Sequence, residues 1–565
     1  MTTIKLMKKS LLITLSLFGL LLLNGCTDLT ENVLDEASAA GLTDKQAADG
    51  NLAPVYARLP DVFTHTTYFA AQEISTDEAI LPYRGGTDWG DNGIYVAMHQ
   101  HTHGSTDPNL RNTWLLLAQG ISRSITALNT LPTINDPSAK VYLAEARGMR
   151  AYYNMLMLDL FGVVFGKDDP QGVSEILRGD VATEYLKKEF LAAEPDLLTT
   201  VGPGRLTKGA VWGLLARLHL NAAVYRDRYA ATFTAKPEDM DKVTEYCDKI
   251  INSGQYQLSP DYFAIFNSNN NTNKELVFAV DQRAELNGHN RLAYFSLSGD
   301  QFPLPLFPLA NGTDGPAITP DFYRTWVNAY APRDPAGVDP RFSKTNWTIP
   351  ADSCIAEANF NFNRGILRGQ QYGLIRVNGA FLRCGTNYRI GRLFNLTRSR
   401  PTLPVNFTEQ VNYTVAGSDY NTGFRVLKYE FSRKSASGRN LGDADISIVR
   451  LADVYLMRAE AKLRKSNDAA SALADVNLVR ASRTAVGTPA PALTSMTLDL
   501  LLRERGFELY WECLRRTDLI RFGKYEDKWT EKTDANSQKR IFPIPQTAID
   551  GASNLPGYLA QNPGY

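Results

Sequence analysis

A glycine-rich stretch of the chain, residues 81–93, combines the residue types that bind sugars. Flat aromatic rings pack under the C–H faces of a sugar ring, while carboxylates, amides and guanidinium groups take its hydroxyls. Four glycines in this stretch let the backbone expose its side chains. The members that could contact a ligand are Tyr83, Arg84, Asp88, Trp89 and Asp91. We expect Trp89 to be the main stacking ring and Tyr83 the second; the alternative is a loop whose tryptophan packs back onto the protein.

Aromatic residues in the middle of the chain could form a second wall of such a site. The candidates are Tyr294, Phe302, Phe307, Trp326, Tyr330 and Trp347, of which Tyr294, Phe302 and Trp326 are selected. Trp326 follows Pro320 on a segment that could be a short helix, so burial in a core is the competing interpretation.

Three histidines, His99, His101 and His103, alternate along the chain. On a strand all three would point to one face and could bind zinc. No carboxylate or thiol completes such a site nearby, so ordinary hydrogen-bonded histidines in a loop are the favoured interpretation. We expect no metal and no cofactor.

Charged residues at helical spacing form the most conspicuous pattern of possible acid–base chemistry. The set is Glu145, Arg147, Arg150, Asp453, Glu460, Arg505, Glu508, Arg516, Asp518 and Arg521. Such spacing is typical of ion pairs within and between helices, so we interpret them as scaffold. The common hydrolase, nucleotide-binding and metalloprotease motifs do not occur. The chain is therefore not expected to be an enzyme, although carboxylates distant in sequence leave a surface glycoside hydrolase as an alternative.

The first 26 residues have the pattern of an export signal. Lys5, Lys8 and Lys9 precede an apolar run, 11–23, that is too short to span a bilayer. The run ends at Cys26, where cleavage of a lipoprotein signal would fall, and an acidic polar stretch follows. We expect Cys26 to carry a lipid that anchors the chain to a membrane; an ordinary secretory signal is the alternative.

The remaining sequence divides into helical flanks and an irregular middle. Apolar residues recur at steps of three and four in 142–160 and 211–225, and helical patterns also cover 182–198, 446–465, 468–483 and 498–511. Small residues such as Ala459 and Ala461 suggest paired helices of tetratricopeptide type. The middle, about 255–441, is rich in Asn, Gly and Pro and contains short strand-like pieces at 276–280, 374–377 and 424–429.

Composition argues against nucleic acid and anionic lipid as partners, and it leaves open whether a disulfide forms. Basic and acidic residues number 60 each, and no basic block suggests binding of nucleic acid or anionic lipid. Besides Cys26, Cys247 and Cys513 lie in helical patterns and are expected to be buried. Cys354 and Cys384 lie in the irregular middle and could form a disulfide in an oxidising compartment.

Several motifs occur together in an order that resembles the SusD/RagB family of nutrient-binding outer-membrane lipoproteins. They follow Cys26 as the segments 73–78, 84–89, 145–153, 159–162, 450–460, 503–509, 516–523, 542–546 and 561–565. The sequence Arg450-Leu-Ala-Asp-Val-Tyr-Leu-Met-Arg-Ala-Glu460 is highly characteristic of the family. Cys513-Leu514 departs from the family pattern, at a position that concerns helix packing.

The resemblance implies a mainly α fold in which four tetratricopeptide-like helix pairs support an irregular, loop-rich ligand-binding part with short strands. It also implies a partner, a SusC-like TonB-dependent β-barrel transporter, over which the protein would act as a lid. The expected ligand is an oligosaccharide, with peptide capture as an alternative. The expected organisation is a signal at 1–25, a tether at 26–40 and one fold at 41–565, whose parts are 41–254, 255–441 and 442–565. The expected location is the outer membrane, held by lipid and facing the exterior.

Overall fold

The structure is a computed structural model, and the chain separates into two compact units, Met1–Ala47 and Ala48–Tyr565. The residues that the structure describes are 41–84, 93–167, 171–283, 291–293, 295–297, 299–301, 305, 312–313, 315–345, 353–396, 400–413, 419–433 and 442–565. Of the first unit this leaves only 41–47. The account below therefore concerns the second unit.

The N-terminal flank is helical, as its periodicity predicts. Two of its helices begin at clear capping residues: the Asp107 carboxylate accepts hydrogen bonds from the backbone N–H groups of Asn109 and Leu110, and Thr207 Oγ1 accepts one from that of Ala210. The helices are α2 (Asp44–Tyr56), α3 (Leu59–Val62), α4 (Ile94–His99), α5 (Pro108–Thr130), α6 (Ser138–Phe161), α7 (Gly179–Ala193), α8 (Lys208–Leu220), α9 (Ala222–Arg226) and α10 (Pro237–Asn252), with a π-helical turn at Ala70–Ile74.

The C-terminal flank is also helical, but its first segment differs from the expectation. Residues 446–450, predicted as the start of a helix, form strand β19 (Ile446–Arg450), which pairs antiparallel with β4 (Leu276–Val280). Both strands are buried, so continuous apolar residues cannot distinguish strand from helix there. The helices that follow are α12 (Leu451–Ser466), α13 (Ala469–Ser482), α14 (Leu498–Leu509), α15 (Arg515–Arg521) and α16 (Gln546–Gly551).

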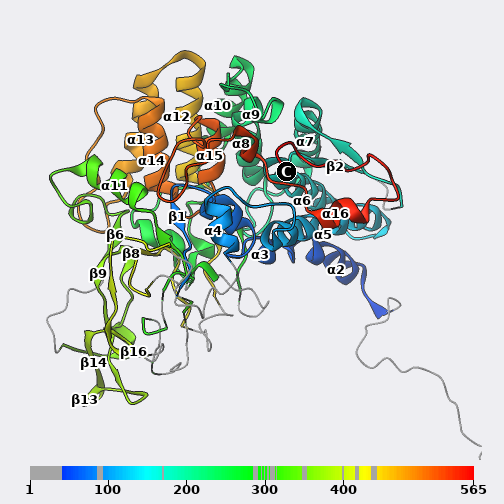
Figure 1. The fold of residues 1–565 in the computed structure, drawn as a ribbon. Helices are drawn as coiled ribbons and strands as arrows, with labels where there is room; N and C mark the ends of the chain where they lie inside the picture. Colours follow the sequence, from blue (N-terminus) through cyan, green and yellow to red (C-terminus); the bar gives the residue numbers. More distant parts are fainter. Residues whose placement is uncertain are drawn as a thin grey trace, which may run out of the picture. The chain divides into compact units, whose positions relative to one another are not determined.

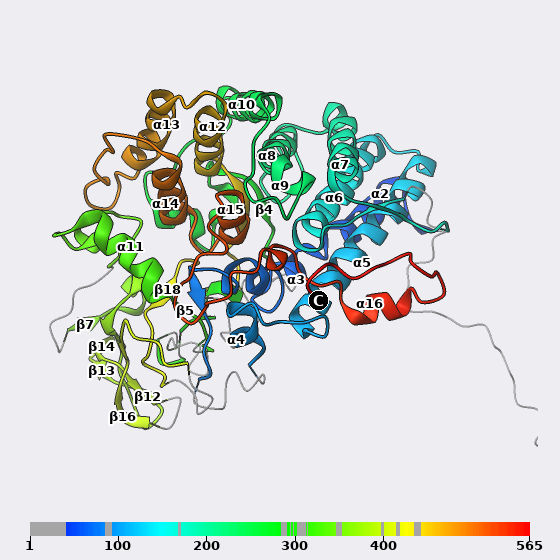
Figure 2. The ribbon, with the colours of Figure 1, turned by 45° about the horizontal axis from the view of Figure 1, so that its top comes forward.

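The helices pack in succession and form a curved row, which confirms the mainly α fold. Helix α5 packs on α6, α6 on α7, α8 on α10, α10 on α12, and α12 on α13 and α14. Only Asn467 and Asp468 separate α12 from α13, so this pair is an antiparallel hairpin; Asp468 caps α13 by accepting from Ser471 N–H. Figure 2 shows the helices from α13 to α6 following one another across one side of the unit.

The irregular middle contributes a helix and many short strands. Helix α11 (Pro320–Tyr330) lies beside the C-terminal helices, and β1 (Ala79–Ile80) pairs with β5 (Ala317–Ile318). A three-stranded sheet joins β18 (Arg425–Leu427), β8 (Arg364–Leu367) and β6 (Ser343–Lys344). A small antiparallel pair, β2 (Val164–Gly166) and β3 (Glu175–Leu177), lies between α6 and α7.

An extension of small strands, here called the β arm (residues 354–407), projects away from the helices at the lower left of Figure 1. Its central strand is β14 (Asn387–Arg392), which pairs with β7 (Cys354–Ile355), β10 (Tyr372–Leu374) and β13 (Arg383–Cys384). A disulfide between Cys354 and Cys384 joins β7 to β13 and answers the question that the sequence left open. The other strands are β9 (Gly369–Gln370), β11 (Arg376–Val377), β12 (Ala380–Phe381), β15 (Phe394–Asn395), β16 (Arg400–Pro404) and β17 (Asn406–Phe407).

A buried network of arginines and carboxylates ties the middle to the C-terminal helices. Arg450, at the end of β19, donates to Glu275, Glu508 and Glu512, each contact at 2.7 Å. Arg483 pairs with Glu275 and Glu508 as well. All these side chains are at least 98% buried. Cys247 and Cys513 are free and buried, as expected.

Within the described residues, no helix combines the length and the apolar character needed to cross a membrane.

Candidate ligand-binding site

The predicted sugar-binding stretch begins and ends at ordered residues that lie close together. Tyr83 is half-buried, and Gly93 closes the stretch with a φ of +81°. A Cβ on Gly93 would lie 2.2 Å from Tyr83 Oη, so only glycine lets the tyrosine pack across the loop's end. Trp89, Asp88 and Asp91 lie outside the described residues, and their ligand contacts remain predictions.

Arg84 is a buried anchor and is not exposed for ligand contact, which corrects its predicted role. Its side chain is fully buried. It donates to the carbonyl oxygens of Gly315, at 3.2 Å, Asp419, at 3.1 Å, and Thr422, at 2.7 Å. The long guanidinium group is used here because it can satisfy several carbonyls from separate segments at once. Arg84 therefore fixes the start of the loop against the middle region.

The turn at 419–422 is a neighbour that the sequence analysis missed. Asp419 is exposed, and Asn421 and Thr422 are half-buried, directly beside the Arg84 guanidinium group. The signal was present, because Asp-Tyr-Asn-Thr-Gly has the same mixture of polar and aromatic residues as the loop. The pairing of β1 with β5 holds the two sides of this region together.

Trp326 belongs to the core, so its predicted place in the second wall is wrong. Its side chain has no exposed surface. The indole stacks on Phe507 with the ring centroids 3.8 Å apart and meets Phe342 edge-on. The hydrophobic face of α11 packs against α14 through this ring, which is why the amphipathic pattern placed it inside. Tyr294 and Phe302 lie outside the described residues.

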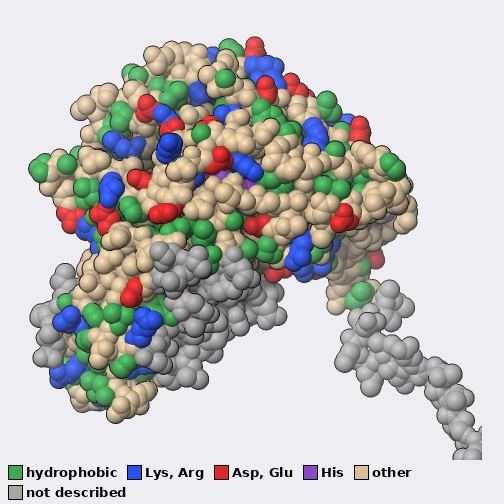
Figure 3. All heavy atoms as spheres, viewed as in Figure 1, with side chains coloured by type: hydrophobic (Ala, Val, Ile, Leu, Met, Phe, Trp, Pro, Cys, Tyr) green, Lys and Arg blue, Asp and Glu red, His purple; other side chains and the backbone are tan. Residues whose placement is uncertain are grey.

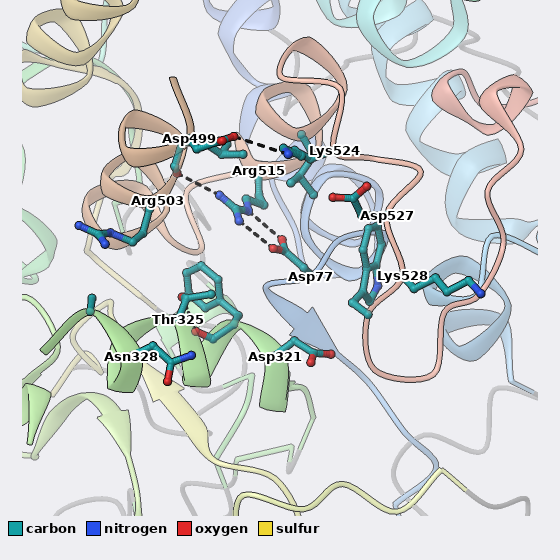
Figure 4. A pocket seen from close by; sticks show the side chains of 15 residues that line it. Asp77, Asp321, Thr325, Asn328, Asp499, Arg503, Arg515, Lys524, Asp527 and Lys528 are labelled. Carbon is teal, nitrogen blue, oxygen red and sulfur yellow. Dashed lines mark hydrogen bonds and ion pairs between the residues drawn. The ribbon is translucent and has the colours of Figure 1, made fainter. Parts of the chain in front are cut away.

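A polar cleft of about 530 Å³ lies between α11, α14 and α15 (Figure 4). Both oxygens of Asp77 accept hydrogen bonds from Arg515, at 2.7 Å each, and Lys524 lies 3.5 Å from Asp499. Asp321 accepts a hydrogen bond from the Thr530 hydroxyl. The carboxylates of Asp77, Asp321 and Asp499 are thus paired, and Asp527 also lines the cleft. Sequence reasoning missed it because its lining comes from four distant segments.

The three histidines do not form a metal site. His99 ends α4, and Nε2 of His101 lies 2.9 Å from the Ser75 carbonyl oxygen. His103 Nε2 lies 3.0 Å from Tyr565 Oη. Burial lowers the pKa of each, to about 3 for His103, so all are neutral at pH 7. No cluster of metal-binding side chains occurs among the described residues, and the loop interpretation is confirmed for His101 and His103.

The charged residues interpreted as scaffold do form ion pairs between helices. Arg505 joins Asp453 to Asp518, at 3.0 and 2.7 Å, and Arg521 joins Asp518 to Glu460, at 2.7 Å each. Burial alone would raise the pKa values of these carboxyl groups, but the surrounding arginines hold them below their usual range. The same is true of Glu508. These groups stay ionised and fasten α12, α14 and α15 together.

Two buried carboxyl groups behave in the opposite way. Glu73 and Glu78 interact directly, and their oxygens accept hydrogen bonds from the backbone N–H groups of Cys513 and Trp511. Burial raises the pKa of both, to about 8 for Glu78. The charge of Glu78 raises the pKa of Glu73 further, whereas Arg515 opposes the rise at Glu78. Trp511 and Cys513 both have positive φ, at 59° and 62°. The carboxyl pair therefore holds an unusual backbone turn between α14 and α15.

This pair predicts that the stability of the protein falls as pH rises. The folded state keeps a proton that the unfolded chain loses near pH 4.5, so the stabilisation is complete below that value and is lost as pH rises towards about 8. Glu73→Gln should reduce the slope of stability against pH by up to about 1.4 kcal/mol per pH unit. Some slope should remain, because burial also raises the pKa of Asp445 to about 7.

Thermal unfolding between pH 5 and 8.5 measures this effect. The matched control is Glu184→Gln, at a side chain that is 69% exposed, and it should leave the slope unchanged. If Glu73→Gln and the control have the same pH profile, the carboxyl pair does not share a proton.

The helical fold matches that of several solved structures. A laminarin-binding SusD-like protein aligns with 93% of this chain and 100% of its own, with a TM-score of 0.63 and 18% identity. Surface glycan-binding protein A from Bacteroides thetaiotaomicron, in complex with laminarihexaose, aligns with 92% and 100%, also with a TM-score of 0.63, at 20% identity. These likenesses establish the fold.

Sequence comparison finds relatives of the same fold family. The pattern of the SusD family matches residues 402–565. The starch-binding protein SusD of Bacteroides thetaiotaomicron is 26% identical over 526 residues, covering 89% of this chain and 86% of that protein. The SusD-like protein P25 of Formosa agariphila is 27% identical over 330 residues, or 56% of this chain and 54% of that protein. In sequence and in fold, this chain is therefore similar to members of the SusD family.

Proposed function

We propose that this protein is a surface lipoprotein of the outer membrane that binds oligosaccharides and delivers them to a SusC-like TonB-dependent transporter, for which it acts as a lid. The observation that carries the proposal is the loop between Tyr83 and Gly93. A buried arginine clamps this loop at its start, and it contains Trp89, Asp88 and Asp91. A stacking ring and polar groups on a fixed base suit a sugar.

Several relatives support this assignment of ligand class. Their names describe binding of starch, of laminarin and of laminarihexaose. In this chain we assign the stacking role to Trp89, with Tyr83 at the loop's edge, and the hydroxyl contacts to Asp88 and Asp91. Tyr294 and Phe302 are proposed for the opposite wall, and the exposed Asp419 turn for its polar rim.

Attachment and delivery follow from the sequence pattern and the family. Cys26 is the proposed lipid site, since it ends an apolar export signal. Energy for import would come from the transporter, so the protein's own contribution is capture and closure. Covalent bonds of the ligand stay intact throughout.

Binding of oligosaccharides to the full chain in detergent tests the proposal. We expect calorimetric titration with oligosaccharides from starch and laminarin to identify a ligand, and Trp89→Ala to weaken its binding at least about tenfold, because the stacked ring and its buried area are lost. Tyr229→Ala is the matched control, since this ring is 38% exposed on a different segment, and it should bind like the parent.

Three results would argue against the proposal. The first is the absence of affinity for every oligosaccharide of a broad panel. The second is the release of shortened products from the ligand, which would indicate a hydrolase. The third is unchanged uptake in cells that lack the protein, which would remove the delivery role.

A further inference from the structure

The β arm carries an unusual concentration of positive charge. Residues 354–407 contain eight arginines, no lysine and a single acidic residue, Glu357, a formal net charge of +7 in a chain whose total is zero. Two of the arginines do not add to the charge of the arm's surface, because Arg364 is buried and Arg368 pairs with Asp334. Blue side chains predominate over red on the visible face of the arm (Figure 3). The helical body therefore carries the compensating negative charge, and the two parts of the molecule differ strongly in potential.

The arm fixes its arginines on a braced frame. Strand β14 pairs with β7, β10 and β13, and the Cys354–Cys384 disulfide connects two of these partners. Arg383 lies on β13 and Arg392 at the end of β14, while Arg400 begins β16. Their backbone positions are set by strand pairing, which favours binding because little order has to be gained when a ligand arrives.

The exposed arginines of the arm meet neutral groups, in contrast to those of the core. Arg383 donates to Tyr388 Oη at 2.7 Å, and Arg392 donates to the side-chain oxygen of Gln370 at 3.4 Å. Arg400 lies over the ring of Tyr420, 4.9 Å from its centroid. All three are exposed, and no carboxylate of the described residues forms an ion pair with them. Their charges remain available to an external anion.

A groove of about 480 Å³ lies on the arm, and Arg392 is the one of these three arginines that lines it. Leu374, Leu393, Phe394 and Pro401 give it an apolar floor, while Arg376 and Arg392 bring guanidinium groups to it; the buried Asp300 also contributes to its lining. An apolar floor accepts the C–H faces of sugar rings. Guanidinium groups bind carboxylate and sulfate oxygens with two parallel hydrogen bonds.

We propose that the β arm is a second glycan-binding surface and that it selects acidic polysaccharides, whose sugars carry carboxylate or sulfate groups. This inference rests on the proposed function, because it assumes that the protein captures glycans, and it adds the ligand's charge class. The groove favours a glycan over an acidic protein surface, since it joins an apolar floor to spaced cations.

The test compares two variants of the full chain in detergent. In the arm variant, Arg383, Arg392 and Arg400 are replaced by Gln. In the matched control, the exposed Lys188, Lys242 and Lys465 of the helical body are replaced by Gln. Polygalacturonate supplies carboxylates, chondroitin sulfate supplies sulfate esters as well, and dextran is the neutral probe. Unfolding temperature and non-reducing electrophoresis check that each variant is folded and keeps its disulfide.

We expect the parent and the control to bind at least one acidic polymer more tightly than dextran, with an affinity that falls steeply between about 50 and about 300 mM salt. The arm variant should bind that polymer at least about tenfold more weakly. The polymer that responds identifies the anionic group. Trp89→Ala should leave most of the salt-dependent affinity in place.

Other outcomes separate the two proposals. Equal binding of acidic polymers by the arm variant and the control would overturn the role of the arm, while oligosaccharide binding lost on Trp89→Ala would still support the proposed function. An arm variant that keeps its polymer affinity but no longer co-purifies with the transporter would also overturn it, in favour of an acidic protein partner. If the arm variant lost polymer binding and Trp89→Ala changed the binding of no oligosaccharide, the proposal for the β arm would be supported and the proposed site at Trp89 would be contradicted.

Discussion

Replacing Arg450 with alanine should lower the free energy of unfolding by about 3–5 kcal/mol, because three carboxylates would lose a partner in a site closed to water. The guanidinium group, 1% exposed, donates to Glu275, Glu508 and Glu512. Arg483, Lys428 and Arg341 also contact these carboxylates, but all three are already engaged. Denaturant unfolding, followed by circular dichroism, measures the loss.

The loss should also depend on pH in a defined direction. In Arg450→Ala the uncompensated carboxyl groups can protonate, so the deficit relative to the parent should shrink as pH falls towards 5. Lys465→Ala is the control, because Lys465 and Asp241 form a half-exposed surface pair whose removal should cost less than about 1 kcal/mol. A deficit as small as that of the control would mean that the network does not stabilise the fold.

Replacing Trp326 with alanine should destabilise the protein by about 3–5 kcal/mol and leave ligand binding by the folded fraction unchanged. The ring has no exposed surface and stacks on Phe507 at 3.8 Å. Its removal would create a cavity between α11 and α14. Unfolding and oligosaccharide titration, carried out on the same preparation, separate the two effects.

Two other substitutions sharpen this result. Trp326→Phe keeps a ring against Phe507 and should recover much of the stability. Trp89→Ala should show the reverse pattern, with lost binding and nearly unchanged stability. If Trp326→Ala bound oligosaccharide more weakly than the parent at a temperature where it is fully folded, its place would have to be reconsidered.

The helical scaffold could be predicted from sequence because its signals are local. Apolar residues at steps of three and four fixed α6 and α8, and Asp468 marked the start of α13, where it caps the helix. The segment 276–280 is strand β4, as predicted. Residues 446–450 were assigned to a helix because their burial hides the alternation of a strand, and only pairing with β4 distinguishes the two.

The site could be predicted only in part, because composition does not report burial. The same reasoning selected Arg84 and Trp326 as ligand contacts. In the structure, Arg84 donates hydrogen bonds to three carbonyl groups of the middle region, and Trp326 packs in the core. Both depend on partners more than 150 residues away or on the packing of α11, which no local pattern contains. The charge of the β arm escaped notice because its arginines are scattered and form no block.

The junction at Arg450 determines what counts as a folding unit. This residue ends β19, whose only strand partner among the described residues is β4, and it directly precedes α12. The stretch that carries the family's sequence pattern starts at residue 402 and therefore lacks both β4 and Glu275. If this stretch were cut from the chain, the edge of β19 would be unpaired. Arg450 would also lose Glu275, one of its carboxylate partners. The segment 402–565, which matches the family pattern, is therefore not expected to fold by itself. The helical flanks and the middle are expected to unfold together.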